Sequence, residues 1–141
     1  MKYSTRLSDA IHILVLIAIN PLDNMTSMTF ANSINTNAGF IRQIMSALKK
    51  ANLIISVHGH ATPSLSKEPE CITLLEIYRA IEGNKPFLHL DTHTNPECGV
   101  GVNIQYSIQD FYNNIQHTAE QEMSKITLKD IINNFEDKLK S

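Results

Sequence analysis

The sequence predicts a mainly helical fold with one small β-hairpin, which places the protein in the α+β class. Two patterns support this prediction. Apolar residues recur at every third or fourth position along most of the chain, as they do on the buried faces of amphipathic helices. The main β-prone stretch is residues 54–57, and turn-forming residues follow it directly, which is typical of a hairpin.

Length and charge indicate a soluble globular protein of one domain, with or without an added oligomerisation element. The chain has 141 residues and a formal net charge of −2. Residues 1–67 hold six basic and two acidic side chains, a balance of +4, whereas residues 68–141 hold six basic and twelve acidic ones, a balance of −6. Because phosphate neutralisation supplies much of the affinity for nucleic acid, we expect only the first half to approach a polyanion.

The first predicted element is a core helix over about residues 4–20. Ser4 or Thr5 can cap its N-terminus, and Pro21 can end it because proline cannot continue a helix. Residues 13–19 form an apolar run within this helix, which is suited to a buried face.

A signal peptide is the alternative for the same segment, because Lys2 and Arg6 precede the apolar run. Asp9 and His12 interrupt the approach to the run, and no small-residue cleavage site comes before Pro21. The run is also shorter than the roughly 20 apolar residues that span a bilayer. We therefore predict a cytoplasmic protein.

Residues 26–53 predict two short amphipathic helices separated by a polar turn, a helix-turn-helix pattern. Thr26 or Ser27 can cap the first helix, and Asn35 or Thr36 the second, since short oxygen-bearing side chains accept bonds from the free N–H groups at a helix start. An α-hairpin with a solvated face is the alternative reading of this stretch.

The second of these helices is predicted to present a polar face to solvent. Its buried face should hold Ala38, Ile41, Ile44 or Met45, and Leu48. Its outward face should hold Asn37, Phe40, Gln43, Ser46, Ala47 and Lys50, with Arg42 and Lys49 alongside. Amide and guanidinium groups can pair with base edges in the major groove, and lysines suit phosphates.

A short hairpin should follow, with strands near residues 54–57 and 64–67 around the loop HGHATP at 58–63. A helix-turn-helix followed by a hairpin has the order of a winged helix. Thr73 and Glu76 have capping-box spacing and open a helix that runs to about Glu82.

Residues 84–98 hold two prolines and no helical period, so we predict an irregular connection. From Gly101 onward a long helix is predicted, with an apolar stripe at Ile104, Ile108, Phe111, Ile115, Thr118 or Ala119, Glu122 or Met123, and Ile126. Because this stripe is too long for a small domain to cover, we expect the helix to pair with a second copy of itself. The alternative is a helix that folds back on its own domain.

A final amphipathic helix should begin at the cap-like sequence of residues 127–130 and carry Leu128, Ile131, Ile132, Phe135 and Leu139 on one face. The predicted organisation is then a winged helix-turn-helix DNA-binding domain at 1–83, a connecting loop with Cys98 at 84–100, and a dimerisation helix with the C-terminal helix at 101–141.

Five stretches of the chain carry a specific likeness to a known family: KYSTRLSDAIH at 2–12, residues 37–53, LSK at 65–67, ITLLEIYRAIE at 72–82 and NPECGVG at 95–101. With these stretches and the predicted order of elements, the chain resembles the Rrf-two (BadM-type) family of bacterial winged-helix transcription regulators over nearly its whole length. The resemblance implies a dimeric repressor of palindromic operators that responds to redox, iron–sulfur or metabolite signals.

The chain departs from cluster-binding members of that family, because Cys98 is the only cysteine in the connecting loop. It therefore resembles the branch without iron–sulfur ligands, and we predict no cofactor, no metal and no catalysis. The hairpin loop also keeps a single glycine, Gly59, where many relatives have several, so wing contacts with DNA are left open.

The predicted DNA contacts lie in the basic first half. They are Lys2, Arg6, Asn35, Thr36, Asn37, Arg42, Gln43, Lys49 and Lys50, with the amides and Arg42 directed at bases and the remaining basic side chains at phosphates. An interaction protein that keeps the fold without binding DNA is the alternative, since the hairpin loop carries only histidines as basic groups.

Cys98 is a candidate oxidant sensor, because the N–H groups at the start of the following helix favour a thiolate. Oxidation could bridge it to its copy in a second subunit or to Cys71. A packing role is the alternative for this thiol. His89, Asp91, His93 and Cys98 offer zinc-compatible donors for a metal-responsive regulator, but their spacing matches no standard site.

Overall fold

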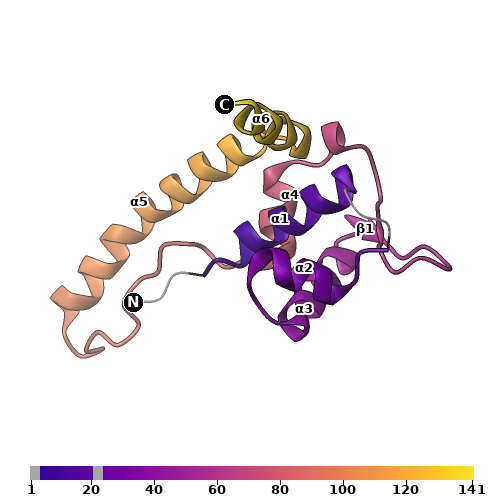
Figure 1. Cartoon of the computed structure of the whole chain (residues 1–141). Coiled ribbons are helices and arrows are strands. Elements are labelled where there is room, and N and C mark those ends of the chain that lie inside the picture. The colour runs from indigo at the N-terminus through magenta and orange to yellow at the C-terminus, as the bar shows by residue number, and fades with distance from the viewer. Residues whose placement is uncertain (1–3, 21–23) are drawn as a thin grey trace.

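The structure is a computed structural model and describes residues 4–20 and 24–141 (Figure 1). Its elements in chain order are α1 (Arg6–Ile19), α2 (Ser27–Ile34), α3 (Ala38–Lys50), β1 (Ile54–Ile55), β2 (Ser64–Leu65), the 3₁₀ turn η1 (Pro69–Cys71), α4 (Leu74–Glu82), α5 (Gly99–Met123) and α6 (Leu128–Lys140). The predicted fold class, mainly helical with one small hairpin, is confirmed.

Helix α1 lies in the middle of the core and buries Ala10, Ile13, Leu14 and Ile17. The N-cap residue of α1 is Thr5, whose side chain makes no cap hydrogen bond, and the Ser4 hydroxyl, one residue earlier, accepts the N–H of Arg6 at 3.2 Å. The Thr5 hydroxyl instead donates to the Asp9 carboxylate at 3.3 Å.

At its other end, α1 stops at Asn20, which adopts a left-handed conformation (φ 40°) and donates its N–H to Leu16 O at 2.8 Å. Asparagine tolerates this conformation better than most residues. The predicted stop at Pro21 and the predicted phosphate contact Lys2 lie outside the described residues.

The helix-turn-helix is formed by α2 and α3. Thr26 caps α2, because its hydroxyl accepts the N–H of Thr29 while the Thr29 hydroxyl accepts the N–H of Thr26, a reciprocal capping box. The cap predicted for α3 was wrong. Asn37, rather than Asn35 or Thr36, caps this helix, with Oδ1 accepting the N–H of Phe40 at 2.8 Å.

The way in which α2 ends explains why Asn37 caps α3. Asn35 adopts a left-handed conformation (φ 65°) and ends α2, with its N–H bonded to Ala31 O, and the N–H of Thr36 bonds to the same carbonyl at 2.9 Å. Both residues are therefore used in closing α2, and the next polar residue begins α3.

The hairpin pairs β1 and β2 antiparallel, with Ile54 opposite Leu65 and Ile55 opposite Ser64. Each strand has two residues, shorter than predicted, because the turn-rich loop takes up residues 56–63. The loop is fixed at its far end by the Thr62 hydroxyl, which donates to Met25 O at 3.1 Å.

Helix α4 is capped by Thr73, whose hydroxyl accepts the N–H of Glu76 at 3.2 Å. The second half of the predicted capping box is not formed. The Glu76 carboxylate pairs instead with the Lys67 ammonium at 2.6 Å, and so connects α4 to the segment after the hairpin.

Helix α5 extends away from the α1–α4 unit as an arm (Figure 1), and none of its residues, all of which lie in the described chain, is buried. It begins at Gly99, two residues before the predicted start, because Cys98 caps it. It ends at Met123, where a turn leads into α6.

Helix α6 returns to the α1–α4 unit. Thr127 and Asp130 form a full capping box at its start, as predicted. A β-bridge between Thr73 and Thr127 attaches it, with Leu74 N–H bonded to Ile126 O and Leu128 N–H to Ile72 O, both at 2.8 Å.

The core therefore extends past residue 83, since Leu128 and Ile132 of α6 belong to the same buried cluster as α1. The division of the chain at residues 83 and 100 stays a prediction. The predicted third part, residues 101–141, contributes side chains to the core of the predicted first part, residues 1–83.

Candidate nucleic-acid interface

Helix α3 has one buried side and one exposed polar side. Ile41, Ile44 and Leu48 are fully buried against α1, α2 and α4, which fixes the rotation of the helix. The exposed side chains are Arg42, Gln43, Ser46, Lys49 and Lys50. The apolar pattern predicted Ala38 on the buried face and Phe40 and Ala47 on the outward face. All three side chains are half-buried.

The hairpin stands beside α3 and leaves a cleft of about 410 Å³ between them. The residues that line this cleft are Ser27, Arg42, Met45, Ser46, Lys49, Ser56, His60, Ala61 and Pro63. Arg42 and Lys49 of α3 thus line the same cleft as His60 of the hairpin loop. Hydroxyl groups of three serines also line it. Arg42 and Lys49 share this side of α3 because seven residues are close to two helical turns.

A second hollow, of about 310 Å³, lies at the start of α3. Asn35, Thr36 and Asn37 line it together with Phe40, Ile34 and the first turn of α1. Because Asn37 Oδ1 is occupied by the helix cap, the amide NH₂ is the part of this side chain that remains to donate.

The structure gathers the predicted DNA contacts into three places. Arg42 and Lys49 lie at the cleft beside the hairpin, Asn35, Thr36 and Asn37 lie at the start of α3, and Gln43 and Lys50 are exposed on α3 outside both hollows. Arg6 is apart from these, in the first turn of α1, where it is half-buried and its Nε has no partner among the described residues.

Sequence reasoning missed four residues of the cleft as candidate contacts, namely Ser27, Ser46, Ser56 and His60. Serines carry little signal by themselves, and the two loop histidines look equivalent in the sequence. The hairpin conformation distinguishes them, because His60 lines the cleft and His58 does not.

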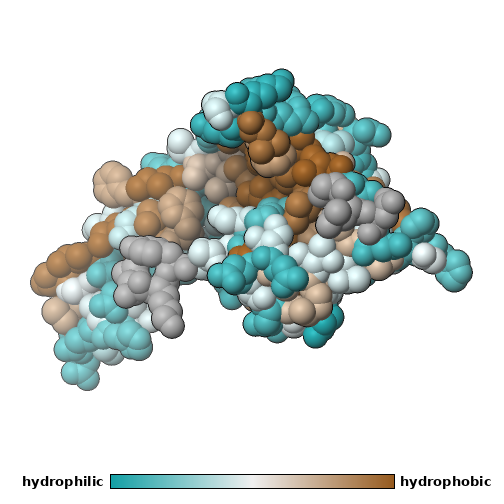
Figure 2. Space-filling view, viewed as in Figure 1, coloured by the Kyte–Doolittle hydropathy of each residue, from teal (hydrophilic) through white to brown (hydrophobic). Residues whose placement is uncertain are grey.

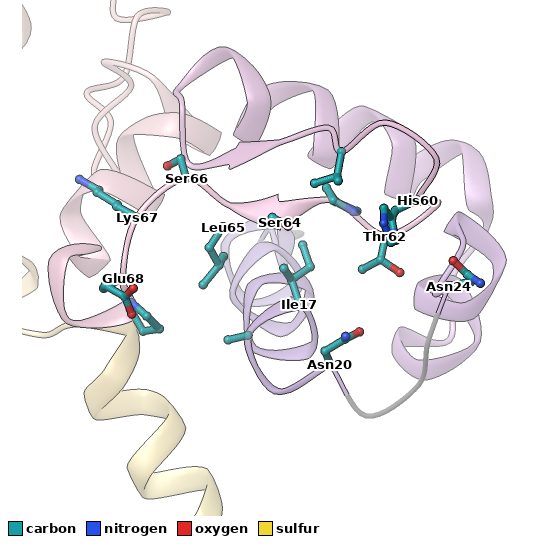
Figure 3. A pocket seen from close by; sticks show the side chains of 14 residues that line it. Ile17, Asn20, Asn24, His60, Thr62, Ser64, Leu65, Ser66, Lys67 and Glu68 are labelled. Carbon is teal, nitrogen blue, oxygen red and sulfur yellow. The ribbon is translucent and has the colours of Figure 1, made fainter.

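A larger hollow of about 880 Å³ lies on the other side of the hairpin, against the C-terminal end of α1 (Figure 3). Ile17 and Leu65 lie in its middle, and polar residues such as Asn20, Thr62 and Ser66 surround them. Lys67 points away from the hollow in this view, in keeping with its pairing to Glu76. This hollow contains none of the predicted DNA contacts.

Cys98 lies where it was predicted, immediately before the long helix. Its Sγ accepts the N–H of Gly101 at 3.4 Å, and the residue is exposed. A Cβ added at Gly101 would stand 2.9 Å from Thr94 Cγ2 and 3.6 Å from Cys98 Sγ, so the loop packs tightly around this cap.

A bridge between Cys98 and Cys71 of the same subunit was a wrong expectation. Cys71 lies in η1, which contacts α6, whereas Cys98 begins α5 at the opposite end of a 25-residue helix. That helix is about 37 Å long, and bridged cysteines need Cα atoms within about 7 Å.

The connecting loop does not assemble a metal site in the part of the chain that the structure describes. His93 donates its backbone N–H to the Asp91 carboxylate at 2.8 Å, and Asp91 donates its own N–H to Gln105 Oε1 at 3.1 Å. No three side chains of the kinds that bind metals come together among residues 4–20 and 24–141. Over the same ranges, no helix has the length and apolar character needed to cross a membrane.

Comparison with known proteins gives the family. Residues 3–134 match the model of the Rrf2 family, described as iron-dependent transcriptional regulators. The chain is 37% identical over 132 residues to YwnA of Bacillus subtilis (strain 168), whose name describes it as an HTH-type transcriptional regulator, and the match covers 94% of this chain and 98% of that protein.

Solved structures agree with this fold. A crystal structure described as that of a DNA binding protein is 37% identical, with a TM-score of 0.74, and the match covers 90% of this chain and 98% of that one. CymR, the global cysteine regulator of B. subtilis, is 21% identical with a TM-score of 0.68 over 94% and 97% of the two chains. IscR of T. potens is 21% identical with a TM-score of 0.71 over 97% and 90%.

Because the Rrf2 family is described as iron-dependent, we compare the residues of this chain with those that an iron–sulfur cluster needs. An iron–sulfur cluster is usually held by four protein ligands, most of them thiolates. This chain has two cysteines, Cys71 in η1 and Cys98 at the start of α5, and no cluster of further donors surrounds them in the described residues. The residues do not fit such a cluster. The family match over nearly the whole chain nevertheless confirms the resemblance seen in the sequence. This protein is a transcriptional regulator that belongs to the Rrf2 family.

Proposed function

We propose that this regulator is a cytoplasmic, homodimeric, DNA-binding repressor whose two copies of α3 read the halves of a palindromic operator. The observation that carries the proposal is the face of α3 beside the hairpin, where amide, guanidinium and ammonium groups are exposed on a helix that the core holds rigidly. A helix of this kind fits the major groove of B-DNA, and a dimer then spans half-sites about one or two DNA turns apart.

The proposed contacts divide by chemistry into two groups. Base edges are read by Asn35, Thr36, Asn37, Arg42 and Gln43. Phosphates are held by Lys2, Arg6, Lys49 and Lys50. Amides and guanidinium groups can make paired bonds to base edges, whereas an ammonium group acts as a point charge toward the backbone.

The cleft between α3 and the hairpin supports a wing contact with DNA. Arg42, Lys49 and His60 lie around it with several hydroxyl donors, and such groups bind the sugar–phosphate backbone. With a backbone in this cleft, α3 would occupy the major groove on one side and the hairpin loop would reach the neighbouring minor groove.

Dimerisation through α5 is supported by its apolar surface. Figure 2 shows apolar residues along this arm, continuing toward the surface beneath α6. Ile104, Phe111 and Ile115 are exposed, Phe111 by 69%. A contiguous apolar stripe of this size is costly in water, and a second copy of the same helix would cover it symmetrically.

The proposed signal is an oxidant that acts on Cys98. The thiol is exposed, and its sulfur caps α5 by accepting the N–H of Gly101. Oxidation of this sulfur, or a disulfide to Cys98 of the second subunit, would change the start of the dimerisation helix and so weaken operator binding.

Selection of genomic fragments by the purified full-length chain tests the proposal, followed by fluorescence anisotropy on a selected duplex at several salt concentrations. We expect tight binding to a palindrome and a steep fall in affinity as salt rises, because each phosphate contact releases counterions. Recovery of no enriched sequence, together with weak binding to all duplexes, would contradict DNA binding and favour an interaction protein with the same fold.

A further inference from the structure

A polar network connects α4 to α5 at the point where the arm leaves the α1–α4 unit. We name the four side chains Tyr78, Arg79, Gln116 and Glu120 the α4–α5 joint. Arg79 Nη2 lies 3.0 Å from Glu120 Oε1, and Gln116 Nε2 donates to Tyr78 Oη at 3.1 Å and to Glu120 Oε2 at 3.2 Å.

The joint also includes the backbone of the connecting loop. Tyr78 Oη donates to Lys85 O at 3.2 Å, and Phe87 N–H donates to Gln116 Oε1 at 3.1 Å. Gln116 thus uses both ends of its amide, and Tyr78 both accepts and donates. The ring of Tyr78 is 6% exposed, so the core fixes the position of this hydroxyl.

These bonds hold the arm at the point where it leaves the α1–α4 unit, together with the turn into α6 that the Thr73–Thr127 bridge attaches. None of the residues of α5, all of which the structure describes, is buried, and α4 is the element with which it makes its main contact. Hydrogen bonds depend on direction as well as distance, so several bonds at one place restrict rotation. An exposed ion pair such as Arg79–Glu120 adds little to folding stability.

The angle matters because α4 packs against α3 on one side and α5 on the other. From Gln116 to the start of the helix at Gly99 the arm is about 25 Å long. A rotation of about 10° at the joint would move that end by about 4 Å, which is more than the 3.4 Å rise of one base pair.

We propose that Tyr78, Gln116 and Glu120 are positioning residues for operator binding, which hold α5 at one angle to the reading unit and thereby fix the spacing between the two copies of α3. The inference rests on the proposed function, because it requires a dimer through α5 that binds DNA. In this proposal the joint does not contact DNA. It acts through the distance that it sets between the two copies of α3.

The first test uses Tyr78→Phe, which keeps the buried ring, and Glu120→Ala, with Glu122→Ala as the matched control two residues away. Among the described residues, the ion pair of Glu122 is with Lys125, in the turn directly after α5. Affinities are measured by anisotropy on the selected operator and on duplexes with the centre lengthened or shortened by one or two base pairs, and light scattering checks that the variants remain dimers.

We expect Tyr78→Phe and Glu120→Ala to lower the preference for the correct spacing by about fivefold to tenfold, the factor that one or two hydrogen bonds are worth, while Glu122→Ala keeps it. A wild-type preference in both joint variants, or an equal loss in Glu122→Ala, overturns the inference. Absence of operator binding by the wild-type chain would instead contradict the proposed function.

A second test does not need DNA. A spin label at position 50, in Lys50→Cys with Cys71 and Cys98 replaced by serine, reports the distance between the two copies of α3 in the dimer. We expect a narrow distance distribution for the wild-type joint and a broad one for Tyr78→Phe and Glu120→Ala. Equal widths in all three proteins would show that the joint does not set the spacing.

Discussion

Asn37 Oδ1 accepts the N–H of Phe40 at 2.8 Å, and the same atom lies 3.2 Å from where a Cβ on Gly39 would stand. The side chain therefore caps α3 with its oxygen and leaves its amide NH₂ for the proposed contact with DNA. We expect Asn37→Ala to lower the free energy of unfolding by about 1 kcal/mol, the usual cost of losing a cap. Denaturant unfolding followed by circular dichroism, at one fixed protein concentration, measures this.

Asn37→Asp separates the two roles of this residue. The carboxylate keeps the cap and suits the positive end of the helix dipole, so stability should stay within about 0.5 kcal/mol of wild type. Operator affinity should nevertheless fall, because the NH₂ donor is replaced by a negative charge that faces phosphates. An Asn37→Asp protein with wild-type operator affinity would remove Asn37 from the proposed contacts.

Arg42 and Lys49 lie on the same side of α3 but are proposed to meet different parts of the duplex. Arg42→Ala should weaken binding to the operator by about 1–3 kcal/mol and leave binding to unrelated duplexes nearly unchanged. Lys49→Ala should weaken both alike and lower the salt slope by about one. Anisotropy titrations on both duplexes at several salt concentrations decide, and an unchanged operator affinity in Arg42→Ala would exclude a base contact.

The helices could be predicted from the sequence because their apolar period is local information, and so could the caps of α2, α4 and α6. The start of α3 could not, because Asn35, Thr36 and Asn37 are all able to cap a helix. The choice among them depends on how α2 ends, since Asn35 turns left-handed there and Thr36 bonds back to Ala31. Loop conformation likewise decided which histidine reached the cleft.

The contribution of α6 to the core was also beyond sequence reasoning, because it depends on pairing between distant segments. The β-bridge between Thr73 and Thr127 joins residues 54 positions apart, and no local pattern signals such a contact. The amphipathic period showed that α6 has an apolar face, but it gave no information on what would cover that face.

Leu128 tests this contact, because it is fully buried against the core of the α1–α4 unit. Leu128→Ala should lower the free energy of unfolding by about 2–5 kcal/mol, the range for leucine truncation in a core. Leu139→Ala is the matched control, since Leu139 lies in the same helix and is 69% exposed, and it should change stability by less than about 0.5 kcal/mol. Equal small effects would mean that α6 does not stabilise this unit.

Phe111 tests the dimer, because a charge in the middle of the apolar stripe of α5 cannot be covered by a second copy without a large desolvation cost. Phe111→Lys should give a monomer in sedimentation experiments at concentrations where the wild type is dimeric. Asn113→Lys adds the same charge about 200° around the helix, away from the stripe, and should remain dimeric. A dimeric Phe111→Lys protein would place the interface elsewhere.

Cys98 tests the redox proposal. Peroxide transfers one oxygen to the thiolate to give a sulfenic acid and releases hydroxide, and a second thiol can then displace water to form a disulfide. Either product alters the sulfur that accepts the Gly101 N–H at 3.4 Å and so changes the cap of α5. The wild-type protein should therefore lose operator affinity on treatment with peroxide and regain it with a thiol reductant. Cys98→Ser should keep its affinity under the same treatment, whereas Cys71→Ser should respond like wild type, because Cys71 lies in η1 and does not cap α5. Mass spectrometry of the treated protein locates the modified residue, and a Cys98→Ser protein that loses affinity to peroxide as readily as wild type would exclude Cys98 as the sensor.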